Sequence, residues 1–187
     1  MNKEYKSFTA KNDIDGRTVT GITAVFGNID SVGDVIMPGA FAKTLQEGAK
    51  RALHLWQHDT IQPPTATIKE MREVGRDELP EEVKAGFPEA TGGLLVKREY
   101  LNTPRGDEIL EGIKAGAIKE MSIGFNIIKS DFGTAEGEDV RFLREVRLWD
   151  TSDVNWGANA ATAASKTALV SPNRRPPAVV VVPPSRS

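Results

Sequence analysis

The strongest indication of the fold is a succession of short segments rich in β-branched and other apolar residues, separated by turns that contain glycine or proline. Such segments favour β-strands, and few of the stretches between them are long enough for a crossover helix. Because parallel sheets need such crossovers, we expect an α+β domain, a mainly antiparallel β-barrel flanked by two or three helices. We expect about seven or eight strands, the clearest at 17–26, 51–59, 65–71, 92–101, 121–131 and 140–156.

One helix has clear signals at both of its ends. Thr103 is a suitable N-cap, Pro104 suits the first helical position, and Gly116 can end the helix. The sequence therefore predicts a helix over 104–115. Its buried face is expected to carry three apolar residues, Ile109, Leu110 and Ile113.

The remaining connections are less regular. A short apolar stripe predicts a second helix over 39–48. The polar stretch 72–91 resembles an insertion, and Pro80 is expected to begin a short helix within it. The segments 27–34 and 132–139 are rich in glycine and acidic residues, and we expect both to be loops.

The chain has 187 residues, which suits one domain over 1–165 followed by a tail over 166–187. The tail is rich in proline, so we expect it to be disordered or extended. A net charge of −2 gives no general attraction to nucleic acid. The longest apolar run, 179–182, is far too short to span a membrane, and the N-terminus does not resemble a signal peptide.

The chain contains no cysteine and only two histidines. The lack of cysteine excludes disulfides, thiol nucleophiles and thiolate zinc sites. With only two histidines as well, a structural zinc site is not expected, and we expect no other metal and no cofactor. If the chain is a nucleophilic enzyme, a serine activated by a histidine is the ordinary arrangement that remains.

The two histidines, His54 and His58, lie in the segment LHLWQHD. In a continuous strand they would share one face with Trp56. His58 lies at the expected strand end, where reactive groups gather, but a surface or capping role is equally open. We expect His54, in the middle of the strand, to be a packed or hydrogen-bonded structural residue.

Ser122 in the segment KEMSIGF is the candidate nucleophile. A serine in a strand is commonly a structural residue, and this alternative stays open. Gly124, two residues later, lies on the same strand face and leaves it without a side chain, which suits the close approach of another group. The third member of a triad would be an acid from the last strand or the second histidine; the acidic candidates are Glu145, Asp150 and Asp153.

Four segments in order resemble the signatures of the tailed-phage prohead proteases, the capsid-maturation serine proteases. GNIDSVGDVIMPGAF resembles the N-terminal signature, LHLWQHD the histidine motif, KEMSIGF the serine motif and LWDTSDVNWGANAAT the closing motif. The resemblance covers about residues 5–165. The sequence departs from the family after the histidine motif, where QPPTATI lacks the expected glycine.

The resemblance implies a serine endopeptidase in which Ser122 is the nucleophile, His58 the base and Asp150 the acid. It also implies the fold of the herpesvirus maturation proteases, a β-barrel flanked by helices. Such enzymes act in the host cytoplasm, inside the immature procapsid. They cleave scaffold protein or the scaffold-like segment of the major capsid protein, and then themselves, so these proteins are the expected partners. A homo-oligomer is possible, and neither nucleic acid nor membrane is expected as a partner.

Two other functions remain open at this stage. The chain could be a catalytically inactive capsid-assembly or scaffold protein on the same fold, or another serine hydrolase such as an esterase. The tail likewise has two interpretations, a disordered terminus or a segment that the enzyme removes from itself.

Overall fold

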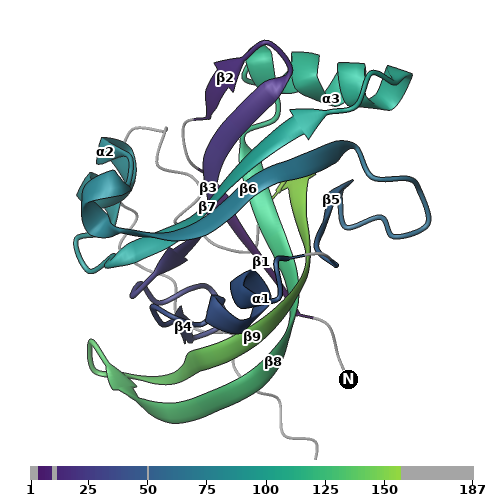
Figure 1. Cartoon of the computed structure of the whole chain (residues 1–187). Helices are drawn as coiled ribbons and strands as arrows, with labels where there is room; N and C mark the ends of the chain where they lie inside the picture. The colour runs from purple at the N-terminus through teal and green to yellow at the C-terminus, as the bar shows by residue number, and fades with distance from the viewer. Residues whose placement is uncertain (1–3, 10–11, 50, 157–187) are drawn as a thin grey trace, which may run out of the picture.

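A computed structural model describes residues 4–9, 12–49 and 51–156. A nine-stranded sheet curls into a half barrel, with helices at its ends and margins (Figure 1). The strands are β1 (Glu4–Thr9), β2 (Asp13–Asp15), β3 (Thr18–Phe26), β4 (Asp34–Ile36), β5 (Leu53–Trp56), β6 (Ala66–Gly75), β7 (Gly92–Tyr100), β8 (Glu120–Ala135) and β9 (Glu138–Val154). The helices are α1 (Ala42–Gln46), α2 (Glu81–Gly86) and α3 (Pro104–Lys114), with a 3₁₀ turn at Arg76–Glu78.

The sheet is mixed. Its strands follow the order β1-β8-β9-β5-β6-β7-β3-β2, and β4 pairs with β9 outside that path. Most neighbours are antiparallel, as expected, but β4 and β5 both run parallel to β9. The expected barrel is a half barrel among the described strands, because the terminal strands β1 and β2 are not hydrogen-bonded to each other.

The core lies inside the curl of the sheet. The main cluster is built from apolar side chains of β3, β7, β8 and β9, together with Phe41 beside α1. A second cluster forms where α3 packs against the sheet. There Ile109, Leu110 and Ile113 are buried with Val19 and Tyr100, which confirms the predicted buried face of this helix.

The ends of α3 also follow the sequence prediction. Thr103 is the N-cap, and its side chain accepts a hydrogen bond from the backbone N–H of Gly106 at 3.2 Å. Pro104 occupies the first turn, where its missing N–H is not needed. Gly116 follows the helix with φ +68°, a left-handed conformation that glycine adopts without strain.

Two predicted irregular segments contain more strand than expected at their edges. The expected loop 132–139 is a hairpin turn, because β8 continues to Ala135 and β9 begins at Glu138. Only Glu136 and Gly137 lie between the strands, with φ of +53° and +84°. The polar insertion begins later than expected, since β6 runs to Gly75 before α2 follows Pro80.

The segment GNIDSVGDVIMPGAF has a structural role in this fold. The Asp30 side chain accepts hydrogen bonds from the backbone N–H groups of Val32 and Asp34. The Asp34 carboxylate in turn accepts two hydrogen bonds from Arg141, at 2.8 and 2.9 Å, and so ties β4 to β9. The predicted loop 27–34 is therefore a tight turn that leads into the short strand β4.

The proline-rich segment 166–187 lies outside the described residues. None of the described helices combines the length and the apolar character that a membrane span requires.

Candidate active site

The pairing of β8 with β9 determines which side chains share a face near Ser122. Ser122 lies opposite Ser152, and Gly124 lies opposite Asp150. Side chains directly opposite one another in a ladder project from the same face of the sheet. Ser122, Ser152 and Asp150 therefore share one face, while the intervening Ile123 points into the core.

A β-bulge in β9 gives Asp150 this orientation. Phe125 pairs with Leu148, whereas its neighbour Gly124 pairs with Asp150, so that Trp149 is an extra residue in β9. Leu148 belongs to the core cluster. Without the bulge, strict alternation would place Asp150 on the same core face as Leu148; the bulge redirects it to the face of Ser122.

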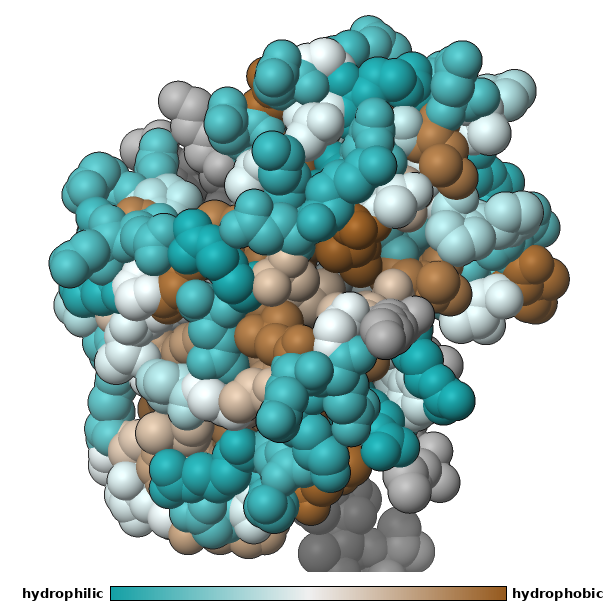
Figure 2. All heavy atoms as spheres, in the orientation of Figure 1, coloured by the Kyte–Doolittle hydropathy of each residue, from teal (hydrophilic) through white to brown (hydrophobic). Residues whose placement is uncertain are grey.

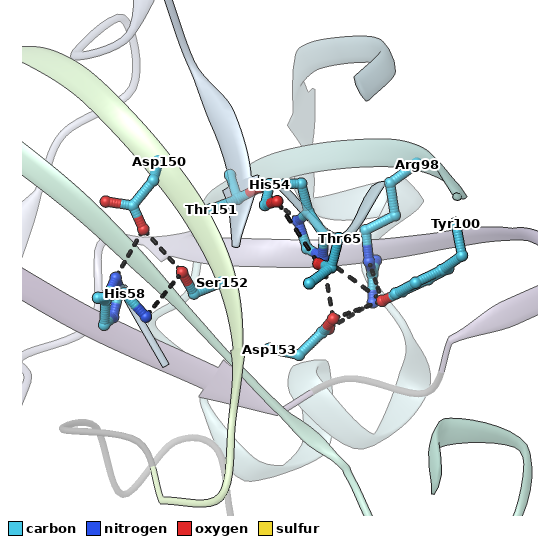
Figure 3. A network of polar contacts seen from close by, with 9 residues as sticks. All are labelled: His54, His58, Thr65, Arg98, Tyr100, Asp150, Thr151, Ser152 and Asp153. Carbon is cyan, nitrogen blue, oxygen red and sulfur yellow. Dashed lines mark hydrogen bonds and ion pairs between the residues drawn. The ribbon is translucent and has the colours of Figure 1, made fainter. Parts of the chain in front are cut away.

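His58 reaches this face through a turn, which corrects the expected strand over 51–59. Strand β5 ends at Trp56, and the next two residues, Gln57 and His58, have φ of +55° and +57°. Such left-handed residues reverse the course of the chain. His54 and His58 therefore do not share a face: they contact opposite sides of β9 (Figure 3).

On the Ser122 side of β9, His58 meets an acid and a hydroxyl. His58 Nδ1 lies 2.6 Å from Asp150 Oδ1, and both side chains are largely buried. An ionised carboxylate only accepts hydrogen bonds, so His58 Nδ1–H is the donor. Ser152 Oγ donates to the same carboxylate oxygen at 2.7 Å and accepts a hydrogen bond from the His58 backbone N–H at 3.3 Å.

Ser122 completes the face, but its hydroxyl is not hydrogen-bonded to His58. It is 1% exposed, and its Oγ makes no hydrogen bond within the described part of the chain. Asp150 Oδ2 is also buried without a hydrogen bond there. Buried polar atoms are normally paired, and these two oxygens lie on the same face as His58, although unpaired buried atoms also occur elsewhere among the described residues, at Asn28 and Arg98.

The other side of β9 carries a separate, fully buried polar network (Figure 3). His54 bonds through Nδ1 to Thr151 Oγ1 at 2.8 Å and through Nε2 to Asp153 Oδ2 at 2.9 Å. Arg98 Nη2 donates to Asp153 Oδ1 at 3.1 Å, and Tyr100 OH donates to Asp153 Oδ2. As expected, His54 is a hydrogen-bonded residue of the interior.

The charges of this network follow from its burial. Burial lowers the pKa of His54, against the opposing attraction of Asp153, so the imidazole is neutral. Burial by itself would raise the pKa of Asp153, but the charge of Arg98 and the bonds from His54 and Tyr100 lower it to about 2. The network thus holds an ionised Asp153 beside a charged Arg98.

The three acidic candidates for the third member of the triad have different partners in the structure. Asp150 bonds to His58. Asp153 bonds to His54 on the opposite side of the strand. Glu145 forms ion pairs with Lys43 and Lys129 instead.

Several residues of these networks were not predicted. Ser152 belongs to the closing motif, but the sequence alone did not indicate a role for it. Arg98 could have been found from its position, since it alternates in phase with the apolar Leu94 and Val96 and so belongs to a buried face.

An open cavity of about 550 Å³ lies elsewhere, between the end of α1 and β6, and its lining includes Leu45, Leu53, Ile68 and Met71. Hydrophobic residues gather in the middle of the face drawn in Figure 2. The lining does not include Ser122, His58 or Asp150.

Comparison with known proteins points to one family. The family model of the caudovirus prohead serine protease matches residues 5–173. The prohead protease of Enterobacteria phage HK97 is 31% identical over 134 residues, which cover 68% of this chain and 52% of that protein. The chain therefore spans about half the length of this curated relative.

A solved structure supports the fold. The bacteriophage T4 capsid assembly protease superimposes with a TM-score of 0.53 at 15% identity, covering 84% of this chain and 99% of that chain. At this identity, the likeness concerns the fold alone.

Proposed function

Because this chain belongs to the caudovirus prohead serine protease family, we propose that it is a serine endopeptidase with Ser122 as nucleophile, His58 as general base and Asp150 as the orienting acid. One observation carries this assignment. His58 Nδ1 lies 2.6 Å from the Asp150 carboxylate, on the face of β8 and β9 that also carries Ser122.

The mechanism follows from the direction of that hydrogen bond. With its Nδ1 proton bonded to Asp150, the neutral imidazole of His58 has its lone pair on Nε2. Nε2 accepts the hydroxyl proton as Ser122 Oγ attacks the scissile carbonyl carbon. The Asp150 carboxylate stabilises the imidazolium, which then protonates the leaving amine. His58 next removes a proton from water, and the resulting attack releases the acyl group from Ser122.

Access to Ser122 requires a movement. The serine is 1% exposed and makes no hydrogen bond to the described residues, so catalysis needs both an opening and a closer approach of His58. Catalytic hydrogen bonds are often long in free enzymes and shorten when substrate binds. Gly124, opposite Asp150, leaves a part of this strand face without a side chain, where we propose that the substrate chain passes.

The proposed substrates are capsid proteins: scaffold protein, or the scaffold-like segment of the major capsid protein, cleaved inside the immature procapsid in the host. The relatives support this choice, since one is a prohead protease and another a capsid assembly protease. We also propose that the half barrel is related to the fold of the herpesvirus maturation proteases. The protease domain would then cover 1–165, and 166–187 would be a tail.

The test is the substitution Ser122→Ala. We expect it to abolish cleavage of a capsid or scaffold substrate by the purified protein while circular dichroism shows an unchanged fold. Ser130→Ala, an exposed serine of the same strand, is the matched control and should keep full activity. Equal cleavage by the Ser122→Ala protein would contradict the assignment. If the unsubstituted protein cleaves neither substrate, the alternative of an inactive assembly protein is favoured.

The same pair of proteins tests self-processing. We expect mass spectrometry to find a shortened C-terminus in the active protein and an intact one in Ser122→Ala. Identical termini in both would show that the tail is not removed by this activity.

A further inference from the structure

Ser152 is the member of this face to which the proposed mechanism assigns no role. Its side chain is fully buried. Its Oγ lies 2.7 Å from Asp150 Oδ1 and 3.3 Å from the His58 backbone nitrogen. A single hydroxyl therefore contacts both the acid and the main chain of the base (Figure 3).

The direction of both hydrogen bonds follows from the groups involved. An ionised carboxylate can only accept, so the Ser152 proton points to Asp150. A backbone N–H can only donate, so the His58 amide bonds to a lone pair of Ser152 Oγ. Asp150 Oδ1 thus receives two protons, one from Ser152 and one from His58 Nδ1. Two donors on one oxygen restrict the orientation of the carboxylate.

The hydroxyl also supports an unusual turn. Gln57 and His58 are consecutive left-handed residues, a conformation that persists only where surrounding contacts hold it. Two contacts from β9 do so: the Gln57 N–H donates to the Asp153 carbonyl at 3.0 Å, and the His58 N–H donates to Ser152. The position of the His58 ring therefore depends on Ser152.

We infer that Ser152 is a positioning residue of the active site. Its hydroxyl holds the Asp150 carboxylate and the His58 main chain in one arrangement, so that the imidazole is presented to Ser122, the ladder partner of Ser152. This role rests on the proposed function. A serine with a purely structural role would affect stability without changing the His58 ring.

The first experiment observes the His58 ring without any catalysis. Proton NMR of the Ser122→Ala protein should show a His58 Nδ1–H resonance, assigned by its loss in His58→Gln; the chain has only one other histidine. Adding Ser152→Ala should weaken or abolish that resonance, because a less restrained ring exchanges its proton faster with water. Ser152→Thr, which keeps the hydroxyl, should retain it. An unchanged resonance in the Ser152→Ala protein overturns the inference, whether or not the protein is a protease.

The second experiment measures turnover. Ser152→Ala should lower kcat by roughly 10- to 100-fold, as expected for a misplaced catalytic group, with little change in KM. Ser152→Thr should recover most of the rate, and Ser130→Ala should match the unsubstituted enzyme. An unchanged kcat for Ser152→Ala, in an enzyme that Ser122→Ala inactivates, overturns the positioning role. If Ser122→Ala stays active, the proposed function is wrong, and the NMR result alone decides the role of Ser152.

Discussion

At the scale of single residues, the face that carries the proposed catalytic groups also holds two unpaired buried oxygens. Ser122 Oγ and Asp150 Oδ2 are buried and make no hydrogen bond to the described residues. Leaving a buried polar atom unpaired costs about 1–3 kcal/mol, and more if the atom is charged. Such a cost is understandable where substrate or a moving side chain supplies the missing partner during the reaction.

The substitution Asp150→Asn tests whether Asp150 is the third member of the proposed triad. The amide keeps the shape of the side chain but removes the charge that stabilises the His58 imidazolium, and it can impose the wrong tautomer on the ring. We expect kcat to fall by roughly 10²- to 10⁴-fold, measured on a peptide derived from the capsid substrate. Asp139→Asn, at an exposed position of β9, is the control. A rate near that of the unsubstituted enzyme would exclude Asp150 as the third member.

At the scale of elements, the site is assembled by local breaks in regular structure. The bulge at Trp149 redirects Asp150, and the turn at Gln57 and His58 carries the histidine to the same side. Bulges occur frequently next to active sites for this reason. Regular strands would have placed Asp150 in the core and His58 beside His54.

The β8–β9 hairpin allows a prediction about element stability. Glu136 and Gly137 both have positive φ, as in a two-residue turn of type I′. Gly137→Ala should destabilise the protein by about 1 kcal/mol, because a Cβ is unfavourable in that conformation. Glu136→Asn should be neutral or slightly stabilising, since asparagine is preferred there. Urea unfolding of both variants checks this; an equal loss in both would contradict the turn assignment.

At the scale of the whole molecule, β9 has a different role on each of its two sides. One side carries the candidate active site, and the other holds the buried network of His54, Arg98, Tyr100, Thr151 and Asp153. This network joins β5, β7 and β9, strands that are distant in sequence. The hydrogen bonds of this network therefore hold β9 in place on the side opposite Asp150 and Ser152.

The network predicts how stability responds to acid. Folding lowers the pKa of His54 from 6.5, so below about pH 6.5 the unfolded chain binds a proton that the folded chain excludes. Stability should therefore decrease by up to about 1.4 kcal/mol per pH unit on acidification below that point. The contribution of Asp153, whose folded pKa is about 2, should persist until the pH falls below about 4.

Urea unfolding at pH 7 and pH 5 measures the loss of stability that His54 is expected to cause. The protein should lose stability between these values, and His54→Gln should reduce that loss, even though it is less stable at pH 7. An equal loss of stability in both proteins would show that His54 does not cause the acid sensitivity.

Part of the fold and the set of candidate residues could be predicted because their signals are local in the sequence. The ends of α3 depend on Thr103, Pro104 and Gly116, each acting on its own neighbourhood. The order of the four motifs predicted a family that the comparisons confirm. Because the chain has two histidines, the candidate bases are limited to His54 and His58 by composition alone. The roles of Ser122, His58 and Asp150 stay predictions until they are tested.

Which side chains meet depends on the tertiary fold. The face on which Asp150 lies depends on one extra residue in β9, and the face of His58 depends on two left-handed residues after β5. Neither the bulge in β9 nor the turn after β5 has a strong local signature, since Trp149, Gln57 and His58 are not residues that specify bulges or left-handed turns.

Most of the longer elements, the family and the set of candidate residues thus follow from the amino-acid sequence, because their signals act over a few neighbouring residues. Long-range strand pairing determined that Asp150 and Ser152, rather than Asp153 or Glu145, contact His58. The motif resemblance already points to Asp150, but the contact itself depends on register, which is set by packing between strands that are distant in the chain.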